Sequence, residues 1–83
     1  MRIDKYLKNS RIIKRRTVAK EACEQGRVLL NGKAAKPGDE VKVGDNIEIN
    51  FGNGSRKIQI IRVDDNVPKD KAQELYKELY KEL

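Results

Sequence analysis

The spacing of the apolar residues changes once along this 83-residue chain, near Gly26, and this change limits the folds open to it. Before that point apolar residues recur three and four positions apart, as in Ile3, Tyr6 and Leu7, which is the spacing of one face of a helix. After it they alternate with polar residues, as in residues 47–51, which is the period of a strand. We therefore expect an α+β domain, in which two short N-terminal helices pack on a small, twisted, mostly antiparallel sheet.

The second helix is expected to run from about Lys14 to Gln25. Gly26 should follow it in the left-handed conformation that commonly ends a helix. Ile12 and Ile13 should fill the space between the two helices. The buried side of the second helix is predicted to hold small or apolar residues, namely Val18, Ala19, Ala22 and Cys23.

The pair Asn31-Gly32 is the clearest turn signal, because it is favoured at the centre of a type I′ hairpin. This turn joins two expected strands within residues 27–35. Further strands are expected where apolar residues alternate, at residues 41–43, 47–51 and 58–63.

The last part of the chain is predicted to form a C-terminal amphipathic helix after a linker at residues 64–68. Asp70 and Gln73 are placed as a capping box. This helix either folds back over the sheet or docks on a partner and is loose when alone. Residues 1–63 are thus expected to form the main domain, and residues 64–83 the linker and helix. Six residues follow the helical spacing: Ala72, Leu75, Tyr76, Leu79, Tyr80 and Leu83.

Positive charge is concentrated in the first twenty residues. Eight cations there accompany a single acid, Asp4, for a net charge of +7, whereas the whole chain carries +6. The rest of the chain is therefore nearly neutral in sum, and such a localised basic surface is typical of a protein with a phosphate-bearing partner. The eight cations are Arg2, Lys5, Lys8, Arg11, Lys14, Arg15, Arg16 and Lys20.

Histidine, which catalysis commonly uses, is missing from the sequence. The chain has no histidine and a single cysteine, so it offers neither imidazole acid–base chemistry nor a histidine metal ligand. We expect a non-enzymatic protein that uses no metal and no cofactor. Cys23 fits the core as a small apolar residue, and Tyr6 fits it better than it fits base stacking. The lone cysteine and the lack of a long apolar run predict a cytoplasmic protein without a membrane span.

Three short motifs, at fixed spacing, resemble those of a known family. They are the apolar-Asp-apolar start at residues 3–7, Gly-x-Val-x-x-Asn-Gly at residues 26–32, and Val-x-x-Gly-Asp-x-Ile at residues 41–47. On these residues the chain resembles the S-four RNA-binding domain, also called the alpha-L motif. It is similar to the small bacterial ribosome-associated members of that family, which include the heat-shock protein of fifteen kilodaltons and its short relative in ribosome-associated quality control.

This resemblance implies a protein that docks on the large ribosomal subunit and contacts its rRNA and a peptidyl-tRNA. It also implies a role in ribosome-associated quality control, where such a protein supports the C-terminal tailing of stalled nascent chains by a tailing factor. We expect a ribosome-associated monomer that does not bind membranes.

Arg16 is the first candidate for RNA contact, because the planar guanidinium can bind two phosphate oxygens at once. Arg15 occupies the position where the family usually has a serine that caps the second helix. Loss of that cap costs about 1 kcal/mol and places a cation at the positive end of the helix, which a phosphate partner would explain. The other predicted RNA-binding residues are Arg2, Arg11, Lys5, Lys8, Lys14, Lys20, Arg27 and Lys33.

Two other classes of protein stay open on the sequence alone. A DNA-binding helix-turn-helix-like regulator fits two short helices of which the second is basic, but it fits less well a hairpin directly after them. A membrane-surface or protein-partner module is the other alternative, although the basic segment lacks the bulky apolar face that membrane insertion needs.

Overall fold

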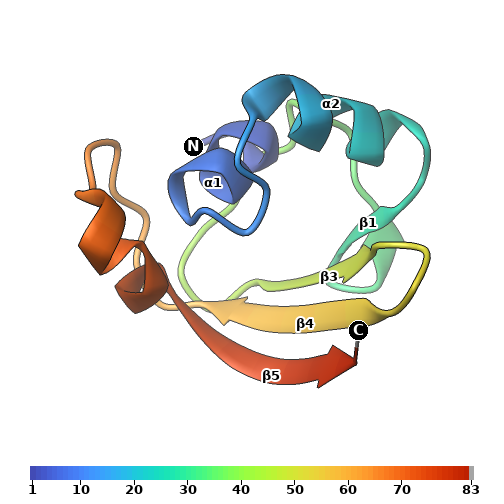
Figure 1. The fold of residues 1–83 in the computed structure, drawn as a ribbon. Coiled ribbons are helices and arrows are strands. Elements are labelled where there is room, and N and C mark those ends of the chain that lie inside the picture. The colour runs from blue at the N-terminus through green and yellow to red at the C-terminus, as the bar shows by residue number, and fades with distance from the viewer. Residues whose placement is uncertain (83) are drawn as a thin grey trace.

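The computed structural model describes residues 1–82, and within this part the α+β class is confirmed. Figure 1 shows the two α-helices side by side over the strands. None of the helices in residues 1–82 has the length and apolarity needed to cross a membrane. In chain order the elements are α1 (Ile3–Asn9), α2 (Arg16–Glu24), β1 (Val28–Leu30), β2 (Lys33–Ala34), β3 (Asn46–Asn50), β4 (Ser55–Ile60), the 3-10 helix η1 (Lys69–Leu75) and β5 (Tyr76–Glu82).

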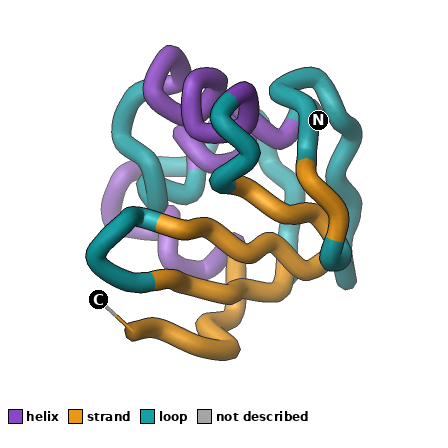
Figure 2. The backbone as a smooth tube through the Cα atoms, turned by 90° about the vertical axis from the view of Figure 1, so that its right-hand side faces the viewer, coloured by secondary structure: helices purple, strands orange, loops and turns teal. Residues whose placement is uncertain are grey.

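The strands of this described part form a single five-stranded sheet in the order β2-β1-β3-β4-β5, and every neighbouring pair is antiparallel (Figure 2). The predicted hairpin is confirmed: Leu30 pairs with Lys33 across the turn, and Asn31 and Gly32 have φ angles of 51° and 84°. Positive φ at both central positions is the requirement of a type I′ turn.

The core lies between the helices and one face of the sheet. Ile3, Tyr6 and Leu7 are fully buried, as the helical spacing predicted, and they meet the alternate isoleucines of β3 and β4. Ile12 and Ile13, in the segment that joins α1 to α2, are also buried and belong to the core. Helices of seven and nine residues are too short to be stable alone, so this packing stabilises them.

The limits of α2 differ from the prediction at both ends. It begins at Arg16 rather than Lys14 and ends at Glu24, after which Gly26 takes the predicted left-handed conformation with φ of 73°. The prediction that Val18 is buried was wrong, since this residue is 46% exposed. Consecutive residues of a helix lie about 100° apart around its axis, so Val18 falls outside the buried stripe of Ala19, Ala22 and Cys23.

The strand expected at residues 41–43 is not formed. Val41 is buried and its N–H donates to the Met1 carbonyl oxygen at 2.9 Å, whereas Val43 is 62% exposed. The segment before Val43 instead pairs with the N-terminus, through an isolated bridge between Arg2 and Glu40. The alternation of two valines was therefore not sufficient evidence for a strand in the sheet.

The predicted C-terminal helix is wrong beyond residue 75. Ala72 and Leu75 are buried at a spacing of three, which a 3-10 helix places on one face, and Tyr76 then starts β5. Residues 76–82 form a strand because they pair with the outer edge of β4, which would otherwise present unpaired N–H and C=O groups. Of the other residues assigned to the helix, Leu79 and Tyr80 are about half exposed, and Leu83 lies outside the described residues.

Candidate nucleic-acid interface

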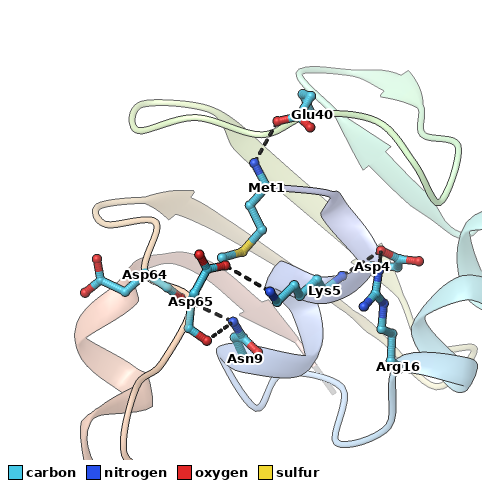
Figure 3. Close-up of polar contacts among 8 residues, drawn as sticks. All are labelled: Met1, Asp4, Lys5, Asn9, Arg16, Glu40, Asp64 and Asp65. Carbon is cyan, nitrogen blue, oxygen red and sulfur yellow. Dashed lines mark hydrogen bonds and ion pairs between the residues drawn. The ribbon is translucent and has the colours of Figure 1, made fainter.

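Arg2 and Arg16 meet at the carboxylate of Asp4. Arg2 Nη2 lies 3.2 Å from Asp4 Oδ2, and Arg16 Nη2 lies 3.5 Å from Asp4 Oδ1. Figure 3 shows Arg16 reaching from the start of α2 toward this carboxylate on α1. The Asp4 side chain is buried, whereas the side chains of Arg2 and Arg16 are each about half exposed. Two cations on one anion leave an excess of one positive charge at the surface.

The backbone around Arg2 is fixed by the loop that follows β2. The Met1 amino group contacts Glu40 Oε2 at 2.7 Å, and the Ile3 N–H donates to the Asp39 carbonyl oxygen at 2.8 Å (Figure 3 shows the first contact). The guanidinium of Arg2 lies beside Gly38, where a Cβ atom would come within 3.8 Å of Arg2 Cζ. The residues on either side of Arg2 are therefore anchored, and its side chain is presented from a rigid position.

Arg15 is the N-cap of α2, and it forms no side-chain capping bond. The predicted loss of the cap is thus seen in the structure. Arg15, Arg16 and Lys20 are all exposed and lie in or just before α2. The first backbone N–H groups of a helix carry partial positive charge, so the end of α2 adds to the field of these side chains.

The role of Asp4 at this site is not evident from the charge pattern of the sequence. There it is the one acid among eight cations, whereas in the structure its side chain brings together two arginines that are fourteen residues apart. Its carboxylate also accepts the Lys5 N–H at 2.7 Å, which fixes it in the first turn of α1. The signal for it was present in the apolar-Asp-apolar start of the chain, since a buried aspartate needs positive partners.

Lys5 is turned toward one of the protein's own acids. Its Nζ contacts Asp65 Oδ1 at 2.9 Å, and Asn9 Nδ2 donates to the carbonyl oxygens of Asp64 and Asp65 (Figure 3). The hydrogen bond and the charge of Lys5 hold the pKa of Asp65 below its usual value. Lys5 therefore anchors α1 to the segment before η1, and its charge is less available to a partner.

The remaining predicted residues divide into two groups. Arg27 is partly buried and its Nε donates to the Asn50 carbonyl oxygen at 2.9 Å, whereas Lys33 is exposed on β2. Neither contacts Asp4 or the two arginines bound to it. The other group lies on α1, on α2 or between them, and its members are exposed and have no ion-pair partner among residues 1–82; they are Lys8, Arg11, Lys14, Arg15 and Lys20.

Tyr6 and Cys23 belong to the core, as predicted. The Tyr6 hydroxyl donates to the Leu75 carbonyl oxygen at 2.7 Å, and burial, followed by the neighbouring Tyr76, raises the pKa of this phenol. Burial is also the main reason that the pKa of the Cys23 thiol rises to about 11. Within residues 1–82 no group of three or more potential ligands is placed to hold a metal ion.

A comparison with known families now bears on this surface. The model of the S4 domain matches residues 1–47, which include both arginines, Asp4 and the hairpin. The chain belongs to the S4 domain family. This is the S-four RNA-binding family that the three sequence motifs indicated.

Among S4 domain proteins, the chain is similar to two proteins named RQC P-site tRNA stabilizing factor. The protein from Listeria innocua is 54% identical over 76 residues, which cover 92% of this chain and 83% of that protein. The protein from Halalkalibacterium halodurans is 53% identical over 76 residues, covering 92% and 86%. Trimeric heat shock protein 15 of Vibrio cholerae has a similar structure, with a TM-score of 0.87 and 35% identity over 94% of this chain and 80% of that one.

Proposed function

We propose that this protein is a non-enzymatic RNA-binding factor of ribosome-associated quality control, which docks on the large ribosomal subunit and stabilises the P-site tRNA. Its membership of the S4 domain family and the names of its relatives support this proposal. By the same reasoning it acts in the cytoplasm on ribosomes that hold a peptidyl-tRNA, and it assists a tailing factor that extends the stalled chain.

The observation that carries the proposal is the pair of half-exposed arginines at Asp4. A structured RNA offers phosphates and 2′-hydroxyls on an A-form surface, because its major groove is too deep and narrow for side chains to read. A guanidinium whose position is fixed by Asp4 loses less conformational freedom on binding than a free one does. Arg2 and Arg16 are thus preorganised for phosphate oxygens, and the exposed Arg15 and Lys20 extend the same surface.

The experiment is a gradient fractionation of cell lysate with the parent protein and with Arg16→Ala. We expect the parent to migrate with the large subunit, and Arg16→Ala to bind about 1–3 kcal/mol more weakly, the range for a charge-assisted contact. Arg62→Ala is the matched control, because it removes an exposed guanidinium that faces Asp64 and lies outside the S4 match. If Arg16→Ala co-migrates as fully as the parent and the control do, the assignment of this site is wrong.

A double-stranded DNA probe tests the alternative of a DNA-binding regulator. In the structure α2 is followed, after three residues, by β1 of the sheet, and the buried stripe of α2 faces the core. We expect protein-free rRNA to compete for the purified protein far better than duplex DNA of equal charge. Equal competition would favour the helix-turn-helix-like regulator.

A further inference from the structure

Arg11 has a backbone conformation that arginine rarely adopts. Its φ angle is 64°, and among residues 1–82 the only other non-glycine residue with positive φ is Asn31 in the hairpin turn. Ser10 is the C-cap of α1, so Arg11 occupies the position just after the helix that glycine usually takes. The equivalent position after α2 is indeed a glycine, Gly26. Glycine would adopt this conformation without strain, yet the chain has an arginine here. Such strain at a non-glycine residue points to a role for its side chain.

Three hollows in the surface meet at Arg11. One, of about 380 Å³, lies between α1 and the segment before η1 and is lined by Lys8, Asn66 and Lys69, among others. The second, of about 370 Å³, is lined by Lys14, Lys69 and Gln73. The third, of about 480 Å³, reaches Arg56 on β4 and Lys81 on β5. The C-terminal segment therefore brings its own basic side chains beside those of the N-terminal half.

The charges around these hollows are predominantly positive. Lys8, Arg11, Lys14 and Lys69 are exposed, and none of them has an ion-pair partner among residues 1–82. Three acids line the hollows, but two of them are neutralised by cations of the protein: Asp65 by Lys5 and Glu78 by Arg56. Asp70 is the remaining acid. Lys81, which lines the third hollow, is likewise exposed without an ion-pair partner among residues 1–82, so five free cations face one free acid, and this surface suits an anion.

We propose that Arg11, with Lys8, Lys14 and Lys69, forms a second phosphate-binding surface for the backbone of a folded RNA. The proposal rests on the proposed function, and it adds a site to which the segment beyond the S4 match contributes. The lining is polar and charged, and the hollows are wide, so they suit a solvated phosphodiester chain better than an apolar protein segment. The protein would then hold RNA at two places, at the arginines bound to Asp4 and around Arg11.

The decisive variant is Arg11→Asn, because asparagine tolerates the left-handed conformation and carries no charge. We expect its melting temperature to equal or exceed that of the parent. Its affinity for purified bacterial large subunits, and for protein-free rRNA extracted from them, should fall roughly threefold to tenfold at fixed salt, with a salt slope reduced by about one.

Two lysines of η1 supply a matched pair. Lys69→Gln removes a cation that lines two of the hollows, whereas Lys71→Gln removes an exposed cation of the same short helix that lines none of them. We expect the first variant to weaken binding to protein-free rRNA and the second to stay within about twofold of the parent.

The outcomes separate this proposal from the proposed function. If Arg16→Ala binds weakly while Arg11→Asn and Lys69→Gln bind rRNA like the parent, the second surface is refuted and the first stands. If Arg11→Asn loses affinity for large subunits only, and not for protein-free rRNA, the surface contacts a protein and the proposal is overturned. A parent protein that binds neither probe would refute both.

Discussion

The Tyr6 hydroxyl, on α1, donates a hydrogen bond of 2.7 Å to the carbonyl oxygen of Leu75, the last residue of η1. The same oxygen also accepts the N–H groups of Ile61 and Arg62, at 2.8 Å and 3.1 Å. A single carbonyl group thus joins the first helix, the end of β4 and the start of β5. Because both Tyr6 and Leu75 are almost fully buried, this junction lies inside the protein.

Tyr6→Phe should lower the free energy of unfolding by about 0.5–1.5 kcal/mol. The loss stays at this modest level because the Leu75 oxygen keeps its two backbone donors and is not left unpaired. Urea unfolding, followed by circular dichroism, measures the change. A loss above about 3 kcal/mol would mean that the hydroxyl does more than donate this one hydrogen bond.

Asp4→Asn tests whether the buried carboxylate positions the two arginines. The variant gains one unit of positive charge, so long-range attraction to RNA should increase. We nevertheless expect weaker binding to rRNA, because Arg2 and Arg16 lose their common anchor. Stability should fall by only about 1 kcal/mol, since both arginine side chains are half exposed and water screens their ion pairs with Asp4.

The control for Asp4→Asn is Glu40→Gln, which also removes one negative charge near the N-terminus but faces the Met1 amino group. Affinity and salt dependence are measured for both variants by fluorescence titration. Glu40→Gln should bind rRNA as tightly as the parent or more tightly. If Asp4→Asn also binds more tightly than the parent, the Asp4 carboxylate only neutralises charge and does not position the arginines.

Removal of residues 69–83 should destabilise the whole domain by more than about 3 kcal/mol. Burial of the Leu75 side chain alone contributes about 1.5–3 kcal/mol, and the pairing of β5 with β4 is lost as well. Thermal melting of the truncated protein measures this. A truncated protein that melts like the parent would show that the segment serves partner binding only.

Cys23 should be protected from thiol reagents in the folded protein. Its pKa is raised from 9.0 to about 11, mainly by burial, so the thiol stays neutral up to high pH. A group with a raised folded pKa favours the folded state below pH 9, and that contribution is lost as pH rises toward 11. Reaction with a chromogenic disulfide at pH 8 should follow the rate of unfolding, and rapid reaction without denaturant would contradict this assignment.

The parts of the fold that depend on residues close together in the sequence could be predicted. The Asn31-Gly32 turn and the buried stripe of α1 follow from local backbone preference and spacing, and both are confirmed. The strand at Tyr76–Glu82 could not be predicted in this way, because Tyr76, Leu79 and Tyr80 follow the spacing of a helix and not the alternation of a strand. The open edge of β4 decided between the two, and this edge belongs to tertiary structure.

The candidate site shows the same division. Its charge was visible in the first twenty residues, but the pairing of charges was not. Lys5 was predicted to face RNA, whereas it contacts Asp65, sixty positions later in the chain. The grouping of Lys69 with Lys8 and Lys14 also depends on where η1 packs, which no local spacing reveals.

The contacts of Lys5, Tyr6 and Asn9 with residues 64–75 have a consequence for the timing of folding. While the chain is being synthesised, α1 lacks these partners until residues 64–75 have left the ribosomal exit tunnel. Contacts between distant parts of a chain also slow folding, since a long loop must close before they form. A newly made copy therefore completes the packing of α1 only after residues 64–75 have become free to fold.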